Sequence, residues 1–147
     1  MEYKTISPKQ TMEVGNTLAS TLKGGDIVAL RGELGAGKTT LMKGIAEFFG
    51  IDPKDVVSPT FTLMQEYKIK RSKDQKITRL IHIDTYRLKS EDELVEIGVE
   101  DYLGEPETVC VIEWPEKMMG LLGVEKYGNI VDINIYDEYG KRNIRVN

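Results

Sequence analysis

The chain has 147 residues, 40% of them hydrophobic and 30% charged, a size typical of one domain with one buried core. Lysine and arginine number 20 against 24 aspartates and glutamates, a net charge of -4, which argues against a surface that binds nucleic acid mainly by neutralising phosphates. A single cysteine, no membrane-length apolar run and no signal-peptide pattern favour the reducing cytosol. We therefore expect one cytoplasmic domain over residues 1–147, with no membrane segment.

The first half of the chain predicts a strand, a helix, a second strand and a second helix. A short strand is expected over residues 3–6, and residues 7–10 (Ser-Pro-Lys-Gln) are typical of a capping box. Apolar or small residues then recur at helical spacing up to the glycine pair at 24–25. Residues 26–30 are short, apolar and β-branched, as in a mid-sheet strand, and residues 39–49 have a helical period.

The second half predicts more strands. Residues 61–69 and 77–83 are expected to pair antiparallel across a polar connection. Residues 90–93 (Ser-Glu-Asp-Glu) form a second capping box, and a buried strand is expected over 109–112. Alternating apolar residues from 131 to 146, with a turn near Gly140, predict a closing hairpin. We expect an α/β domain with a mixed, centrally parallel sheet and a C-terminal antiparallel hairpin.

A phosphate-binding loop is predicted at residues 32–39, which read Gly-Glu-Leu-Gly-Ala-Gly-Lys-Thr between the expected strand and helix. Glycines let successive backbone N–H groups curl around a phosphate, and the following helix presents its positive end. Lys38 is expected to reach the β- and γ-phosphates, and the Thr39 hydroxyl to bind Mg²⁺. A glycine-rich turn that happens to carry a lysine is the alternative, which the flanking strand and helix disfavour. The motif predicts a P-loop NTPase-like three-layer sandwich that binds a nucleotide.

Two acids end mostly apolar strands, as in a Walker B element. Either Asp84 or Glu113 can hold the metal or polarise the attacking water, and an acid that merely starts a loop is the alternative at each. His82 lies on the same strand face as Asp84, and we interpret it as a hydrogen-bonded sheet residue rather than a catalytic one. Trp114 either flanks the nucleotide or caps the core.

A second loop, at Ser58, Pro59 and Thr60, follows the first phosphate-binding unit where many P-loop proteins place a segment that senses the γ-phosphate. Thr60 can contact metal or phosphate there, although an ordinary turn explains the tetrapeptide nearly as well.

Charge is segregated further along the chain. Residues 68–79 contain six basic side chains, whereas residues 90–116 contain ten acids and no lysine or arginine. Two solvated faces are the favoured explanation, and electrostatic docking to a partner is the functional one.

Three function classes fit a P-loop: an ATPase subunit, a small-molecule kinase and a GTP-dependent switch. The chain has only six arginines, with no lid-like cluster, which disfavours a kinase. It also lacks an Asn-Lys-x-Asp element, so adenine is favoured over guanine. Because no arginine is obviously placed to neutralise the transition state, we expect slow turnover of the isolated chain.

Five segments, in order and spacing, resemble the bacterial TsaE family, the ATPase component of the tRNA threonylcarbamoyladenosine machinery. They are residues 32–40, residues 58–61, residues 82–88, Gly98 and residues 112–116. The resemblance implies an ATPase that docks on the TsaB–TsaD complex and supports repeated modification of the adenosine beside the anticodon, in tRNAs reading codons that begin with A. It also implies that the threonylcarbamoyl-adenylate is made elsewhere, and contact with tRNA is expected to be indirect.

Carried over to this chain, the resemblance assigns roles to individual residues. Thr39 and Glu113 are expected to hold Mg²⁺, Asp84 to assist hydrolysis, and Thr11 to border the nucleotide. Lys38, Asp84 and Glu113 are the candidate catalytic residues. The ATP-binding loop comprises Glu33, Leu34, Gly35, Ala36, Gly37, Lys38, Thr39 and Thr40.

Overall fold

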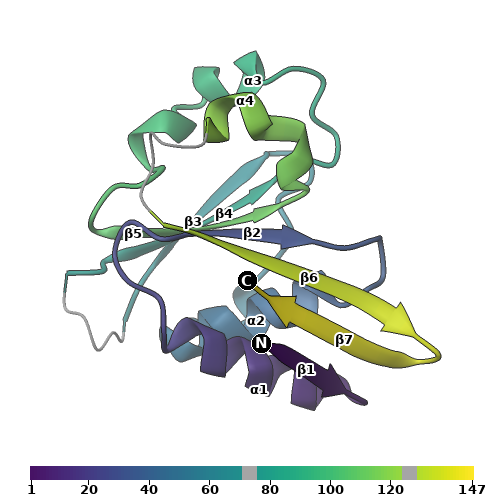
Figure 1. The fold of residues 1–147 in the computed structure, drawn as a ribbon. Helices are drawn as coiled ribbons and strands as arrows, with labels where there is room; N and C mark the ends of the chain where they lie inside the picture. Colours follow the sequence, from purple (N-terminus) through teal and green to yellow (C-terminus); the bar gives the residue numbers. More distant parts are fainter. Residues whose placement is uncertain (71–75, 124–128) are drawn as a thin grey trace.

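The phosphate-loop segment leaves the central strand of a seven-stranded sheet in the computed structural model, which describes residues 1–70, 76–123 and 129–147 (Figure 1). The strands are β1 (Glu2–Thr5), β2 (Ile27–Arg31), β3 (Met64–Lys68), β4 (Arg79–Asp84), β5 (Thr108–Glu113), β6 (Ile130–Glu138) and β7 (Lys141–Val146). The α-helices are α1 (Pro8–Ala19), α2 (Lys38–Phe48), α3 (Asp92–Glu96) and α4 (Met119–Leu122). Short 3₁₀ turns occur at η1 (Pro53–Asp55), η2 (Val99–Asp101) and η3 (Pro115–Met118).

The sheet has the order β1-β7-β6-β2-β5-β4-β3 and is parallel at its centre. Strands β4, β5, β2 and β6 pair parallel with one another in that order, and β3 pairs antiparallel with β4 at one edge. At the other edge, β7 pairs antiparallel with both β6 and β1. The expected mixed sheet with a parallel centre and a C-terminal hairpin is therefore confirmed.

Helices cover both faces of the sheet and make three layers. Figure 1 shows α1 and α2 together on one face and α3 and α4 on the other. Residues 27–30 of β2 are at most 1% exposed, as expected for a strand buried on both faces. Cys110 on β5 is 1% exposed, and burial raises the pKa of its thiol to about 12. Within the described residues, no helix combines the length and the apolar character needed to cross a membrane.

Helix α1 begins at the predicted cap but ends early. The Ser7 hydroxyl accepts a hydrogen bond from the Gln10 backbone N–H at 3.2 Å, while the Gln10 side chain accepts from Ile6 rather than from Ser7. The helix stops at Ala19, before the glycine pair at 24–25, where we expected its end. The Thr21 hydroxyl bonds the Leu18 carbonyl there, and such local side-chain bonds compete with the helical ladder.

The strand expected from residue 61 begins only at Met64, so that prediction is wrong for residues 61–63. Leu63 has a φ of 68°, its N–H bonds the Pro59 carbonyl at 2.7 Å, and its carbonyl accepts the Asp84 N–H at 2.9 Å. These bonds fold the segment into a turn that meets the end of β4. Most of the polar connection expected before β4, residues 71–75, lies outside the described residues.

Helices α1 and α2 approach closely through two glycines. A Cβ at Gly15 would lie 2.5 Å from the Leu41 carbonyl oxygen, and a Cβ at Gly44 would overlap the Met12 backbone. The two helices support one face of the sheet beside the phosphate loop, so their spacing sets the position of the first turn of α2.

We expect Gly44→Ala to lower the free energy of unfolding by about 1–3 kcal/mol, because the added methyl group meets backbone atoms that have no rotamer with which to yield. Urea denaturation measures the change. Thr17→Ala, on the exposed side of α1, is the matched control and should change stability by no more than about 0.5 kcal/mol. Equal stability of the two variants would contradict the close helix contact.

Candidate functional site

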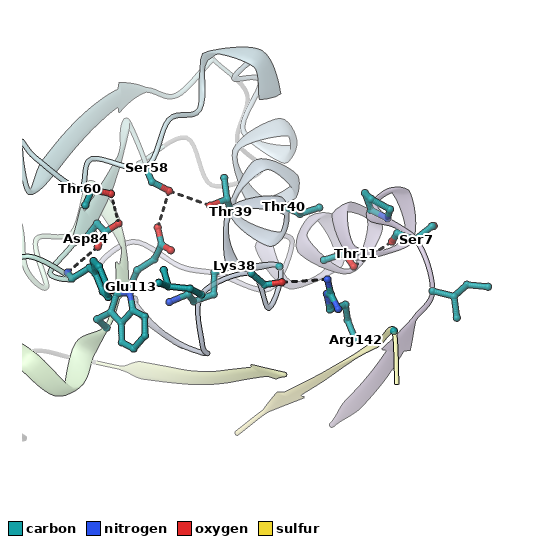
Figure 2. Close-up of a pocket in the computed structure, with 18 residues that line it drawn as sticks. Ser7, Thr11, Lys38, Thr39, Thr40, Ser58, Thr60, Asp84, Glu113 and Arg142 are labelled. Atoms are coloured by element: carbon teal, nitrogen blue, oxygen red, sulfur yellow. Dashed lines mark hydrogen bonds between the residues drawn. The ribbon is translucent and has the colours of Figure 1, made fainter. Parts of the chain in front are cut away.

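A pocket of about 380 Å³ opens at the carboxyl ends of the parallel strands (Figure 2). This is the edge of an α/β sheet at which ligands usually bind. Of the residues that the sequence assigned to the nucleotide, the metal, catalysis or the loop at 58–60, those that line the pocket are Thr11, Leu34, Gly35, Gly37, Lys38, Thr39, Thr40, Ser58, Thr60, Asp84 and Glu113. Three others do not line it: Glu33 is exposed, whereas Ala36 and Pro59 are buried in the protein.

The phosphate loop owes its shape to its glycines. Gly37 precedes α2 with a φ of 107° and Gly35 has a φ of 80°, a region that other residues rarely occupy. A Cβ at Gly32 would lie 2.5 Å from the Ile135 carbonyl oxygen, so the loop also needs glycine where it passes β6. The resulting curve places the N-terminus of α2 at the pocket, and a helix N-terminus after a glycine loop suits an anion.

The Lys38 ammonium group is buried and unpaired. The residue is 5% exposed, and its Nζ has no hydrogen-bond partner among the described residues. Nζ lies 3.7 Å from the centroid of the Trp114 ring, in a cation–π contact. Burial lowers the pKa of Lys38, and the nearby charges of Glu113 and Asp84 oppose that shift. An anion bound in the pocket would supply the missing partner.

The two predicted acids lie side by side at the ends of neighbouring strands. Asp84 of β4 and Glu113 of β5 are partners in the parallel register and are 4% and 3% exposed. The Asp84 carboxylate accepts hydrogen bonds from the Thr60 hydroxyl at 3.2 Å and the Tyr86 N–H at 2.9 Å. Two buried carboxylates facing a buried lysine can hold a divalent cation and orient a water molecule.

The loop at 58–60 connects the phosphate loop with both acids, as Figure 2 shows. The Ser58 hydroxyl lies 3.1 Å from the Thr39 hydroxyl and donates to Glu113 Oε2 at 3.4 Å. Thr60 bonds Asp84, so neighbouring residues of one loop contact both strand ends. A loop in this position can respond to a phosphate group in the pocket, which fits the γ-phosphate-sensing interpretation of residues 58–60.

His82 and Trp114 flank Glu113. His82 is 0% exposed and does not line the pocket, and its Nε2 lies 2.6 Å from Glu113 Oε2, so it is a hydrogen-bonded sheet residue as interpreted. Trp114 lines the pocket and has a φ of 60°, and its ring centroid lies 5.3 Å from that of Tyr86. This position in the pocket lining fits the expectation that Trp114 flanks the nucleotide better than the alternative that it caps the core.

The sequence did not reveal the wall of the pocket that the tail hairpin forms. Gly140 and Arg142 line it, and Arg142 donates to the Gly35 carbonyl at 3.2 Å and pairs with Asp137 at 2.9 Å. The only sequence signal was an arginine just after a glycine turn. In Figure 2, Arg142 lies near Thr11, on the opposite side of the phosphate loop from the two acids. The pocket thus contains an arginine, but not beside the acids.

The donor set suits Mg²⁺ held together with a nucleotide. Over residues 1–70, 76–123 and 129–147 no cluster of three or more histidine, cysteine or acidic side chains forms a cage for a metal ion. Magnesium ions bound with nucleotides typically use one or two carboxylates, a hydroxyl group and phosphate oxygens. The Thr39 hydroxyl and the Glu113 carboxylate, bridged by Ser58, supply such a set.

A family model and individual relatives all identify the same protein family. The model of the family described as threonylcarbamoyl adenosine biosynthesis protein TsaE matches residues 5–144. The tRNA threonylcarbamoyladenosine biosynthesis protein TsaE of Aquifex aeolicus is 36% identical over 142 residues, which are 95% of this chain and 90% of that protein. The tRNA threonylcarbamoyladenosine biosynthesis protein TsaE of Bacillus subtilis is 39% identical over 114 residues. The match covers 78% of this chain and 66% of the Bacillus subtilis protein, just under two thirds of its length.

A solved structure is similar as well. The crystal structure of Bacillus subtilis YdiB superimposes with a TM-score of 0.70 and 32% sequence identity, and the match covers 98% of this chain and 82% of that chain. The likeness extends over the tail hairpin, which carries no motif.

We expect Lys38→Ala to weaken the binding of an ATP analogue by about 10-fold to 100-fold, because a charge-assisted contact of about 1.5–3 kcal/mol is lost. Isothermal titration calorimetry measures the dissociation constant. Lys43→Ala, on α2 but outside the pocket lining, is the matched control. Unchanged affinity in Lys38→Ala would remove Lys38 from the binding site.

Proposed function

The chain belongs to the TsaE family of tRNA threonylcarbamoyladenosine biosynthesis proteins, and on that premise we propose that it is the Mg²⁺-dependent ATP-binding and ATP-hydrolysing subunit of the pathway. It acts in the cytoplasm with the TsaB–TsaD complex, on threonylcarbamoylation of the adenosine next to the anticodon. Its contribution is repeated turnover of that complex, while the threonylcarbamoyl-adenylate is formed elsewhere. Direct contact with tRNA is not part of the proposal.

One observation carries the ATP-binding part of the proposal. The Lys38 ammonium group is buried without a hydrogen-bond partner among the described residues, in a pocket lined by a glycine loop and two carboxylates. A buried cation in that state costs free energy, and a phosphate group would supply the contact that it lacks. Asp84 and Glu113 limit the loss of positive charge from Lys38 until the anion arrives.

The roles of the side chains follow from their positions. The loop at residues 33–40, through its free backbone N–H groups, and the Lys38 ammonium would bind the phosphates, and Thr39 and Glu113 would hold the cation. When bound there, Mg²⁺ would neutralise negative charge on the phosphate groups. Asp84, held by Thr60 and the Tyr86 N–H, orients the water molecule that attacks. Thr11, across the phosphate loop from the acids in Figure 2, borders the rest of the nucleotide.

The position of Arg142 supports the expectation that the isolated chain hydrolyses ATP slowly. Among the described residues, Arg142 is the arginine that lines the pocket, and its guanidinium binds Gly35 and Asp137 on the side away from the acids. An arginine that neutralises the transition state is worth about 10³–10⁵ in rate. The proposed partner complex completes or reorganises the site.

We expect slow ATP hydrolysis by the purified chain and faster hydrolysis on addition of TsaB–TsaD, measured as phosphate release. Glu113→Ala should still bind nucleotide but lose hydrolysis with and without the partners. Glu107→Ala, an exposed change just before β5, should behave as the unaltered chain.

Parallel reactions with GTP and with small phosphate acceptors separate the ATPase from a GTP-dependent switch and from a kinase. Turnover of the isolated chain at about 1–100 s⁻¹, as in kinases, or transfer of the phosphate to an acceptor, would contradict the proposal. So would normal hydrolysis by Glu113→Ala.

We expect the affinity for TsaB–TsaD to fall as salt rises from about 0.05 M to about 0.5 M, because the Debye length shortens over this range. In the functional explanation of the charge segregation, exposed acids of α3 and η2, including Asp92, Glu96 and Asp101, supply the charge for electrostatic docking. Analytical ultracentrifugation measures the association, and thermal melting of the free chain controls for stability. Association independent of salt would assign the acidic segment to a solvated face.

A further inference from the structure

An imidazole lies directly behind the proposed metal ligand. His82 is the chain's one histidine, is 0% exposed and lies two residues before Asp84 on β4. Its Nε2 is 2.6 Å from Glu113 Oε2, while the residue does not line the pocket. His82 therefore contacts the carboxylate from the protein side and does not reach a bound nucleotide.

The surroundings of the two ring nitrogens of His82 favour one tautomer. A carboxylate oxygen is an acceptor, so we assign the Nε2 atom as the donor in this 2.6 Å contact. The other nitrogen, Nδ1, is buried and has no hydrogen-bond partner among the residues that the structure describes. A proton on Nε2 satisfies both observations, since a proton on Nδ1 would be buried without an acceptor.

The two oxygens of Glu113 have different surroundings. Oε2 accepts from His82 Nε2 and from the Ser58 hydroxyl. Oε1 accepts no hydrogen bond from the described part of the chain, although Glu113 lines the pocket. One oxygen is thus anchored to the protein, and the other is free for a ligand.

We propose that His82 is a positioning residue for Mg²⁺. It fixes the rotation of the Glu113 carboxylate, so that Oε1 is presented to the cation that arrives with the nucleotide. The inference rests on the proposed function, in which Glu113 holds that cation. A partner behind a metal ligand typically contributes about 10-fold to 100-fold to metal affinity.

Mutations separate positioning from simple packing. Gln places an amide nitrogen near the position of the imidazole Nε2, whereas the shorter Asn places it near Nδ1 and cannot reach Glu113. Both substitutions are polar and of similar size. His82→Gln should therefore keep the hydrogen bond to Glu113, and His82→Asn should lose it.

The experiment compares the dissociation constant of ADP in EDTA with that in excess Mg²⁺, by isothermal titration calorimetry. We expect Mg²⁺ to tighten binding to the unaltered chain, His82→Asn to lose about 10-fold or more of that tightening, and His82→Gln to keep most of it. Affinity in EDTA should be the same for all three. Full tightening in His82→Asn, or equal weakening with and without Mg²⁺, would overturn the positioning role.

The response of the unaltered chain to Mg²⁺ separates a failure of the proposed role of His82 from a failure of the proposed metal site. If Mg²⁺ tightens binding and Glu113→Ala removes the effect while His82→Asn does not, only the role of His82 is wrong. If Mg²⁺ has no effect on the unaltered chain, or Glu113→Ala keeps the effect, the metal site of the proposed function is wrong and the role of His82 falls with it.

A second measurement needs no substitution. Because the chain has a single histidine, its ring nitrogen resonances in a ¹⁵N spectrum can be assigned directly. We expect the tautomer with the proton on Nε2, and a shift of that resonance on addition of Mg-ADP that exceeds the shift with ADP in EDTA. The Nδ1 tautomer, or equal shifts, would overturn the proposal even if His82→Asn failed to fold.

Discussion

The buried, unpaired ammonium group of Lys38 is the constraint on which the rest of the site depends. Taking a cation out of water is expensive, and burial alone would drive Lys38 towards its neutral form. Asp84 and Glu113 oppose that loss, although neither forms a hydrogen bond with Nζ. The sheet makes this balance possible, because the parallel register of β4 and β5 places both acids at the edge from which the phosphate loop leaves β2.

Backbone strain is concentrated around the same side chains. Among the described residues, three other than glycine have positive φ angles: Leu63, Trp114 and Tyr139. The Leu63 carbonyl accepts the Asp84 N–H, and Trp114 follows Glu113 directly and contacts Lys38. Unfavourable backbone conformations persist where surrounding contacts require them, and they gather at ligand sites. The strain at Leu63 and Trp114 thus accompanies the placement of the two acids.

Local signals predicted the centre of the molecule well, and contacts distant in sequence were beyond them. The strand, phosphate loop and second helix follow from glycine spacing and helical period, and the acids from their place at the ends of apolar strands. Arg142 reaches the pocket only because β7 pairs with β6 and β6 pairs with β2, an order that no local pattern specifies. In the same way, periodicity placed His82 on a strand, while its contact with Glu113 depends on the register of two strands about thirty residues apart.

The pocket wall made by the tail hairpin bears on how the protein forms during synthesis. Strand β7 pairs with β1, at the other end of the described chain, and Arg142 contacts the phosphate loop from that strand. A growing polypeptide on the ribosome can complete the phosphate loop early, but it lacks this wall until residue 142 has emerged. The pocket therefore gains its full lining only after the strand that carries Arg142 has been synthesised.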